Sequence, residues 1–269
     1  MHAKPLRAAV VQVLSDSDCA ANIARTADLV DAAAASGARL IVLPETWNWW
    51  GTASATASGA EALDGPSLTA ARGWARDLGV VIVAGSVLEA VGDGSRAFNT
   101  SVLIGSDGND LTAYRKIHLF DVTVDGHEYR ESAATDAGDR AVTGDALGLR
   151  IGMSVCYDLR FPELYRAHAA AGATVLSVPA NFTPATGEAH WELLLRARAV
   201  ENQCFVLAAG QQGIHATGEG AWGHSMIVDP WGRVLAEVPE GEGFAAADLD
   251  LDAQAAIRAS LPALAHRRL

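Results

Sequence analysis

Short runs of β-branched and other apolar residues alternate with longer helical segments along the chain, and this rhythm restricts the possible folds most. The wholly apolar run Leu40–Leu43 predicts a strand that is buried on both faces. The other expected strands are Ala8–Val13, Val80–Gly85, Ala97–Ile104, Leu111–Arg115, Leu149–Val155, Thr174–Val178, Phe205–Ala209, Ser225–Val228, Val234–Val238 and Phe244–Leu249. The expected helices are Asn22–Ala35, a segment from the N-cap Ser67 to the closing Gly79, Glu163–Ala171 behind Pro162, and Glu188–Gln203. The pattern predicts an α/β fold.

One pair of strands indicates that the sheets are mixed rather than parallel. Ala97–Ile104 and Leu111–Arg115 are separated by the turn residues Ser106, Asp107 and Gly108, which is typical of an antiparallel hairpin. The sequence predicts about a dozen strands, which is more than a single twisted open sheet usually contains. We therefore expect two sheets packed face to face and covered by helices, in one domain that spans residues 1–269.

Charge and cysteine content exclude several classes of protein. The formal net charge is −12, so a broad basic face for nucleic acid is not expected. No apolar stretch approaches the roughly 20 residues that cross a bilayer, and the N-terminus lacks the apolar run of a signal peptide. The three cysteines, Cys19, Cys156 and Cys204, form no C-x-x-C motif. We expect a cytoplasmic protein that has no disulfide scaffold, no structural zinc and no membrane partner.

Cys156 is the first candidate for chemistry. It lies in GMSVCYDLRFPELYR, after an apolar strand and before a helix that Pro162 begins. Backbone N–H groups and the helix dipole favour an anion there, which predicts a thiolate. The alternative is a small buried core residue, the more common place for a free cysteine. The polar segment from His118 to Asp145 is long for a simple connection and is expected to border a site.

Two further polar residues end predicted strands. Glu45 follows Pro44 in LIVLPETW, and Lys116 follows the strand in AYRKIHLF. Taken singly, each is more often an exposed side chain than a functional one. Together with Cys156 they supply a base, an oxyanion stabiliser and a nucleophile, because ligands bind at the carboxyl ends of strands in α/β sheets.

Weaker patterns have less support. The sequence GEGAWG at residues 218–223 fits a dinucleotide-binding motif in form, but it opens no helix and is interpreted as a turn. A Cys–His pair or a metal site built from histidines lacks a third group at informative spacing. The tryptophans after Glu45 are expected mainly in core or dimer packing, and secondarily in a pocket wall. The histidines considered for a Cys–His pair are His118 and His190, and those considered for a metal site are His215 and His224. The tryptophans are Trp47, Trp49 and Trp50.

Three sequence blocks, LPETW, YRKIHLFD and SVCYDLRFPELYR, resemble those of the nitrilase superfamily of carbon–nitrogen hydrolases. The similarity extends from AAVVQV to LPALAHRR, and the blocks occur in the family's order. It implies that Glu45, Lys116 and Cys156 form the family's catalytic triad. It also implies a four-layer α-β-β-α sandwich and a homodimer or higher homo-oligomer.

The resemblance also points to a second glutamate between the lysine and the cysteine. Glu131, in a YRES block, occupies that position, and Glu128 is the competing candidate. Glu131 is preferred because Glu-Ser is the family pairing, and its expected task is to hold Lys116 and position the substrate. Two carboxylate neighbours would keep a buried lysine charged.

The implied reaction is cleavage of a small amide to an acid and ammonia through a thioester on Cys156. Glu45 moves the protons, while Lys116 and the backbone N–H of Tyr157 hold the oxyanion. No metal or organic cofactor is expected.

The stretch NFTPATGEAHWELLLRAR resembles the branch of the superfamily that contains deaminated glutathione amidase and ω-amidase, with more similarity to the former. Arg160 would clamp a substrate carboxylate, or alternatively pair with Glu163 or Asp158. Phe182 and Thr186, in the loop after the strand Thr174–Val178, are further pocket candidates. The alternative functions are an ω-amidase that acts on α-ketoglutaramate and a catalytically silent assembly subunit.

Overall fold

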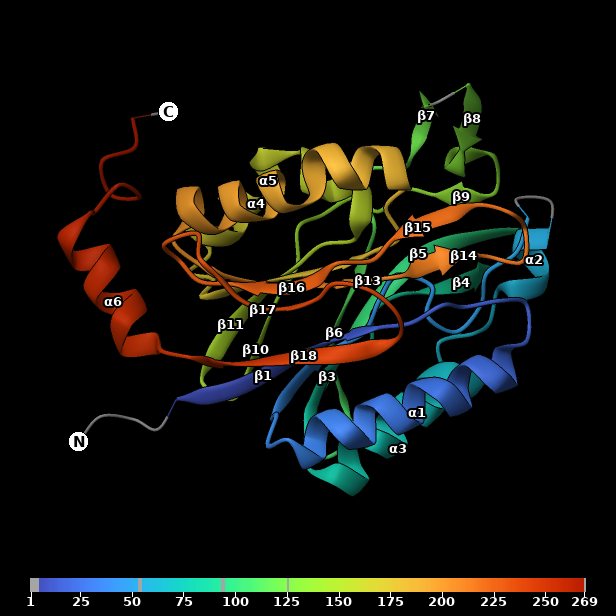
Figure 1. Cartoon of the computed structure of the whole chain (residues 1–269), viewed down its shortest axis with the longest axis horizontal. Helices are drawn as coiled ribbons and strands as arrows, with labels where there is room; N and C mark the ends of the chain where they lie inside the picture. The colour runs from blue at the N-terminus through green and yellow to red at the C-terminus, as the bar shows by residue number, and fades with distance from the viewer. Residues whose placement is uncertain (1–4, 53–54, 93–94, 125, 269) are drawn as a thin grey trace.

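The computed structural model describes residues 5–52, 55–92, 95–124 and 126–268. Figure 1 shows two β-sheets stacked face to face, with helices covering both outer surfaces. The helices α1 (Cys19–Ala35) and α3 (Pro66–Leu78) cover one sheet, and α4 (Pro162–Ala170) and α5 (Pro184–Asn202) cover the other. This is the predicted four-layer α-β-β-α sandwich. The shorter helices are α2 (Thr56–Gly59) and, near the C-terminus, α6 (Leu251–Ser260).

The first sheet contains both parallel and antiparallel pairs. Its strand order is β18 (Gly243–Leu249), β1 (Leu6–Gln12), β2 (Leu40–Val42), β3 (Val81–Val83), β5 (Arg96–Ile104) and β4 (Val87–Val91), and β6 (Asp110–Arg115) and β9 (Thr135–Asp136) also pair with β5. Strands β1, β2 and β3 are parallel. The pair β5–β6 is antiparallel, as the predicted hairpin requires.

The second sheet is mixed in the same way, with a parallel centre formed by β11, β12 and β13. Its strand order is β10 (Thr143–Ala146), β11 (Leu149–Met153), β12 (Val175–Ala180), β13 (Phe205–Gly210), β16 (Ser225–Val228) and β17 (Val234–Val238). Two small hairpins complete the strands: β7 (Asp121–Val124) with β8 (His127–Arg130), and β14 (Gln212–Ile214) with β15 (Gly220–Trp222).

Several helix ends follow from local chemistry. Helix α1 begins at Cys19 because the Asp18 carboxylate accepts a hydrogen bond from the Ala21 N–H at 3.0 Å. In α3, Pro66 occupies the first turn and Gly65 is the N-cap, so the expected N-cap at Ser67 is wrong. Gly79 closes α3 in the left-handed conformation, as predicted.

Two segments differ from expectation. The region from residue 118 to 145 contains the β7–β8 hairpin, the 3₁₀ turn η2 (Glu131–Ala133) and the strands β9 and β10, so it is less irregular than predicted. Helix α5 begins at Pro184 rather than Glu188, which places Thr186 in the first turn of the helix instead of a loop. Part of the GEGAWG segment forms strand β15.

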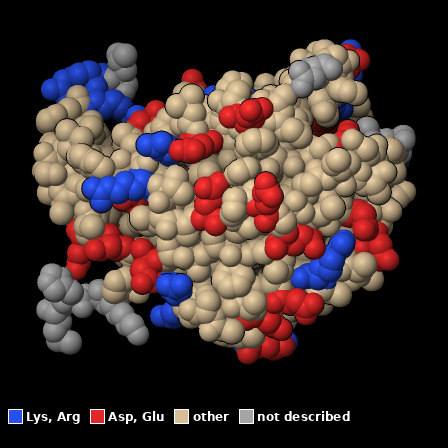
Figure 2. Space-filling view, viewed as in Figure 1, with Lys and Arg blue, Asp and Glu red and all other residues tan. Residues whose placement is uncertain are grey.

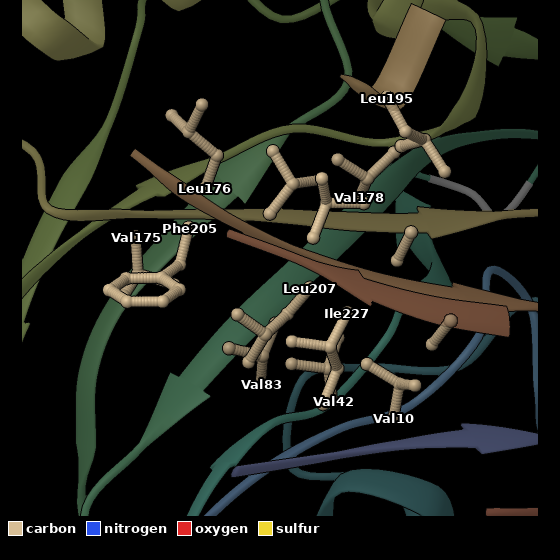
Figure 3. Close-up of a cluster of buried hydrophobic side chains, with 14 of the residues drawn as sticks. Val10, Val42, Val83, Val175, Leu176, Val178, Leu195, Phe205, Leu207 and Ile227 are labelled. Atoms are coloured by element: carbon tan, nitrogen blue, oxygen red, sulfur yellow. The ribbon is translucent and has the colours of Figure 1, made fainter. Parts of the chain in front are cut away.

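The core occupies the space between the two sheets and the space beneath the helices. Along β1, Val10 faces the other sheet while Ala9 and Val11 face α1 and α3, because side chains alternate along a strand. Both sets are buried, which explains why residues 8–11 of the strand are all apolar. Figure 3 shows Val10, Val42 and Val83 of the first sheet opposite side chains of the second sheet such as Leu207 and Ile227.

Charges are dispersed over one face of the molecule. On the face drawn in Figure 2, acidic and basic side chains are interspersed among uncharged ones. Within the described ranges, no helix is long and apolar enough to cross a membrane.

The tight turn after β3 supports the loop that carries Glu45. Gly85 has a φ of +54°, and a Cβ atom there would lie 1.9 Å from the Pro44 carbonyl oxygen. We predict that Gly85→Ala lowers the free energy of unfolding by about 3 kcal/mol, from overpacking together with left-handed strain.

The control for this prediction is Gly79→Ala, which has a φ of +66° but no atom within 4 Å of the added Cβ. It carries the conformational strain alone, so urea denaturation followed by circular dichroism should show a smaller loss, about 1 kcal/mol. Equal losses in the two variants would contradict the steric explanation.

Candidate active site

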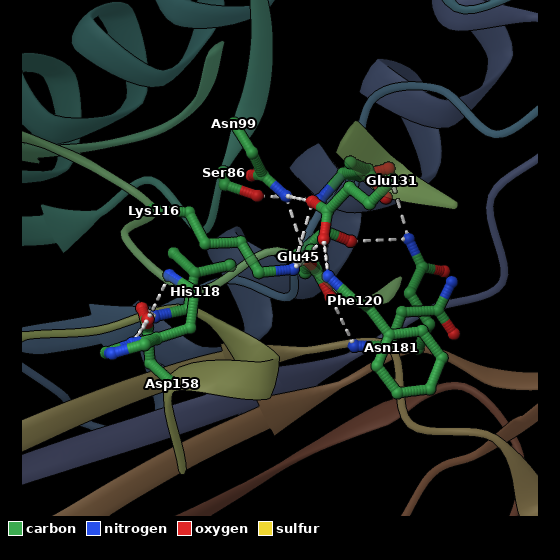
Figure 4. Close-up of polar contacts among 12 residues, drawn as sticks. Glu45, Ser86, Asn99, Lys116, His118, Phe120, Glu131, Asp158 and Asn181 are labelled. Carbon is green, nitrogen blue, oxygen red and sulfur yellow. Dashed lines mark hydrogen bonds and ion pairs between the residues drawn. The ribbon is translucent and has the colours of Figure 1, made fainter. Parts of the chain in front are cut away.

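Glu45 lies just beyond the end of β2, and the residue is 4% exposed. Its Oε1 atom accepts hydrogen bonds from Asn99 Nδ2 at 2.8 Å and from Lys116 Nζ at 3.0 Å. Its Oε2 atom accepts one from the Asn181 backbone N–H at 2.9 Å. Three donors from three different elements therefore hold the carboxylate at the edge where the two sheets meet. Figure 4 shows these side chains converging on Glu45.

Lys116, directly after β6, lies between two carboxylates. Its Nζ donates to Glu45 and to both oxygens of Glu131, at 2.8 Å and 3.0 Å. Glu131 Oε2 also accepts the Phe120 N–H at 2.7 Å. Glu128 also lines the cavity, but it is exposed and pairs with Arg130 at 2.7 Å rather than with Lys116. Of the two candidate glutamates, the structure therefore brings Glu131 to Lys116.

The lysine keeps its positive charge despite a side-chain exposure of only 2%. Burial by itself would lower the pKa of Lys116, but the negative charges of Glu131 and Glu45 raise this pKa well above the ordinary value. Since the folded-state pKa is raised, the stabilisation by these ion pairs is fully present at neutral pH. It is lost only as the pH rises above the unfolded value of about 10.4.

Cys156 begins the 3₁₀ turn η3 (Cys156–Arg160), between β11 and α4. It has a φ of +50°, in the left-handed region that residues with side chains rarely adopt. Burial, followed by the negative charge of Glu45, raises the pKa of the Cys156 thiol well above its usual value, and the opposing effect of Lys116 does not cancel this. The expected thiolate is therefore wrong. The sulfur is protonated at neutral pH, and a base is required to activate it.

The turn that carries Cys156 is held by Asp158, a fully buried carboxylate. Its Oδ2 atom accepts the Val155 N–H at 2.8 Å and the Tyr114 hydroxyl at 2.7 Å. Its Oδ1 atom accepts the N–H of His118 at 3.1 Å and contacts His118 Nδ1 at 2.7 Å. Burial and the charge of Asp158 raise the pKa of the Tyr114 phenol, which keeps it a donor. Asp158 thus connects the cysteine turn to the strand that precedes Lys116.

Glu45, Lys116, Glu131 and Cys156 line a cavity of about 230 Å³. The four substrate-binding candidates from the sequence, Tyr157, Arg160, Phe182 and Thr186, line the same cavity. The aromatic walls are completed by residues from three other segments, namely Trp49, Trp50, Phe120 and Tyr129. Trp47 lies in the core as expected, but Trp49 and Trp50 take the secondary interpretation as pocket wall.

Arg160 contacts the aromatic wall rather than a carboxylate. Its guanidinium lies 5.4 Å from the Phe182 ring centroid and 5.9 Å from that of Tyr157, and Nη1 is 3.3 Å from His190 Nδ1. Asp158, one of the alternative partners, is occupied by Tyr114, Val155 and His118. Across the described part of the chain, no carboxylate forms an ion pair with Arg160.

Sequence reasoning missed Asn99, Asp158 and Asn181. A signal existed for Asn99, an amide in the middle of the otherwise apolar strand RAFNTSVLI. Asp158 offered none, because an acidic residue in a turn is commonly exposed. Asn181 acts through its backbone, which carries no residue-specific signal.

The histidines lie in separate parts of the structure, each with a different partner. His118 contacts Asp158, His215 Nδ1 donates to the Ser15 carbonyl, and His224 contacts Glu237. Among the residues that the structure describes, no cluster of three or more His, Cys, Asp or Glu is arranged to hold a metal ion.

Comparisons with known proteins agree with this geometry. The carbon–nitrogen hydrolase family model matches residues 7–259. The chain is 40% identical to deaminated glutathione amidase of Synechocystis, with 98% of both chains covered. It is 37% identical to the omega-amidase of Homo sapiens, covering 97% of this chain and 95% of that protein.

Among solved structures, the NitFhit protein of C. elegans is similar with a TM-score of 0.93 and 36% identity. All of this chain is covered, and it spans 66% of that longer chain. The match over nearly the whole sequence, together with the buried carboxylate, ammonium and thiol in one cavity, establishes the class of protein. The chain belongs to the carbon–nitrogen hydrolase family, in the nitrilase superfamily, and is an amidase.

Proposed function

We propose that Glu45, Lys116 and Cys156 are the base, the oxyanion stabiliser and the nucleophile of this amidase, and that Glu131 positions Lys116. The observation that carries the proposal is the buried ammonium, which contacts both carboxylates within 3.0 Å beside the Cys156 thiol in one cavity. The alternative of a catalytically silent subunit is disfavoured. Burying charged side chains costs desolvation free energy, and a subunit without catalytic activity has no need of them.

The reaction follows from these positions. As the sulfur attacks the amide carbon, the thiol proton moves to Glu45 and the carbonyl oxygen becomes an oxyanion. Lys116 and the Tyr157 backbone N–H stabilise that oxygen. The C–N bond then breaks while Glu45 returns the proton to nitrogen, which leaves as ammonia or, from a substituted amide, as an amine. Water that Glu45 deprotonates hydrolyses the remaining thioester and releases the acid.

Glu45→Gln removes the group that takes the thiol proton. We predict that amide turnover falls by about 10³-fold, because no base remains. Alkylation of Cys156 by iodoacetamide should slow as well, because burial still raises the pKa of the thiol and Glu45 is no longer there to take its proton. Turnover is followed by product release, and alkylation by mass spectrometry.

Two control variants accompany this experiment. Glu192→Gln neutralises an exposed carboxylate that pairs with Arg196 on α5 and should leave both measurements unchanged. Cys156→Ala should abolish both. Retained turnover in Glu45→Gln, or amide hydrolysis by Cys156→Ala, would refute the assignment.

We propose further that the substrate is a small amide bearing a carboxylate, with deaminated glutathione as the first candidate and α-ketoglutaramate as the second. Support comes from Arg160, a cavity-lining guanidinium that pairs with no carboxylate of the described chain. Thr186, in the first turn of α5, and Phe182 lie on the same wall. The similarity to deaminated glutathione amidase, slightly higher than to omega-amidase, sets the order of the candidates.

Arg160→Ala tests the carboxylate clamp. A hydrogen-bonded charged pair contributes about 1.5–3 kcal/mol, so kcat/KM for both candidate substrates should fall by about 10–100-fold. An uncharged short amide such as butyramide should lose far less. Arg150→Ala, which removes an exposed arginine paired with Asp145, is the matched control and should change neither rate. Equal losses on charged and uncharged amides would contradict the clamp.

We also propose that residues 1–269 act as one domain, in a homodimer that resides in the cytoplasm. The dimer is supported by apolar side chains exposed on α5, where Leu193 is 66% and Val200 50% exposed. The two residues are seven apart and so lie on the same face of the helix, and exposed apolar surface often marks an interface.

Light scattering tests the dimer. The unchanged chain should have twice the mass of 28.0 kDa, and Leu193→Glu should shift the population toward monomer because a charge would be buried. Ala32→Glu, which adds the same charge to the exposed surface of α1, controls for a simple change of charge. A monomeric unchanged chain would refute the proposal.

A further inference from the structure

Asn99 touches each charged group of the site, yet no role has been assigned to it. It lies in the middle of β5 and is 3% exposed. Its Nδ2 atom donates to Glu45 Oε1 at 2.8 Å and is 3.3 Å from Glu131 Oε1. Its backbone carbonyl accepts the Lys116 N–H at 2.8 Å. One residue therefore contacts both carboxylates through its side chain and the lysine through its backbone.

The orientation of the Asn99 amide is determined by its neighbours. A flipped amide would direct its carbonyl oxygen at two carboxylate oxygens, and all of these groups are acceptors. In the observed orientation the Oδ1 atom is buried without a hydrogen-bond partner. A buried unpaired carbonyl costs free energy. The donor side of the amide must therefore contribute enough to offset that cost.

Counting lone pairs distinguishes the two oxygens of Glu45. A carboxylate oxygen accepts about two hydrogen bonds. Oε1 already accepts two, from Asn99 and Lys116, whereas among the described residues Oε2 accepts only the Asn181 N–H. Oε2 therefore keeps capacity for a further proton, beside the cavity that Glu45 and Cys156 both line.

We propose that Asn99 is a positioning residue that occupies Oε1 of Glu45 and so leaves Oε2 as the atom that takes the thiol proton and returns it to the leaving nitrogen. This inference rests on the proposed function of Glu45 as the base. During attack the S–H bond breaks, its proton binds Oε2, and the sulfur electron pair forms the S–C bond. When the C–N bond breaks, the same proton moves from Oε2 to nitrogen.

A second consequence concerns the pH at which the base works. The hydrogen bond from Asn99 favours the ionised form of Glu45, because the amide N–H donates to a negative oxygen. Without it, a proton can bind Oε1 and remain there, away from the sulfur. Loss of the donor should therefore reduce turnover and move the acidic limb of the pH profile to higher pH.

The test compares Asn99→Leu, which keeps the volume but has no donor, with the unchanged enzyme. A hydrogen bond to a charged group changes a titration by about one pH unit, so the acidic limb of kcat/KM should move upward by about that amount. The value of kcat should fall by about 10–100-fold, with little change in KM. Asn99→Ala provides a second variant in case the leucine form does not fold.

Asn202→Ala is the matched control. Asn202 is also fully buried, donates its amide to the Arg198 carbonyl at 3.0 Å and has an unpaired Oδ1 atom. Its loss should lower the Tm but leave the pH profile in place. Asn99 variants that lose stability yet keep the unchanged pH profile would overturn the inference and leave Asn99 a structural residue.

Iodoacetamide alkylation of Cys156 across pH separates this inference from the proposed function. Its acidic limb also depends on proton transfer to Glu45, so it should move upward in Asn99→Leu whatever the amide substrate is. If the unchanged enzyme hydrolyses none of the amides while the alkylation limb moves, the substrate proposal fails and the role of Asn99 stands. If amides are hydrolysed but neither limb moves, the inference about Asn99 fails alone.

Discussion

The buried ammonium of Lys116, held between Glu45 and Glu131, is the interaction on which the rest of the site depends. The side chains of Lys116 and Glu45 are only 2% and 6% exposed, and that of Glu131 is 18% exposed. Such burial is tolerated only where every charge is paired and hydrogen-bonded. The N–H groups of Asn99, Asn181 and Phe120 complete that requirement. A site with fewer donors would have to neutralise one carboxylate, and a neutral Glu45 has no capacity to accept a proton from sulfur.

The same charges determine how the thiol is used. Burial and the charge of Glu45 raise the pKa of Cys156, so the nucleophile is stored as a thiol and is ionised only as its proton moves to the base. The left-handed turn at Cys156 must therefore hold the sulfur close to Glu45. Asp158 provides that restraint through four contacts with Val155, Tyr114 and His118. Several hydrogen bonds hold Glu45, and several others hold the turn that carries Cys156. These hydrogen bonds allow the strained left-handed conformation at Cys156 to persist.

Much of the fold was predictable because local patterns are strong. The apolar run at β2, the hairpin β5–β6 and the glycine that ends α3 all agree with the sequence, since each depends on neighbours a few residues away. The errors also have local causes. Ser67 is a good N-cap residue, but Pro66 already occupies the first turn. Thr186 was expected in a loop because Gly187 weakens the helical pattern, whereas packing of that glycine against Trp222 retains it in α5.

By itself the sequence determined the α/β class, the approximate strand ends and the candidate residues Glu45, Lys116 and Cys156, because periodicity and residue type are local properties of the chain. Only the tertiary structure decided that Glu131 rather than Glu128 reaches the lysine, that the thiol remains protonated, and that Asn99 contacts both carboxylates. These properties depend on distance, burial and the direction of hydrogen bonds between segments far apart in the chain. Such quantities arise when the two sheets bring their edges together, and no pattern within one segment contains them.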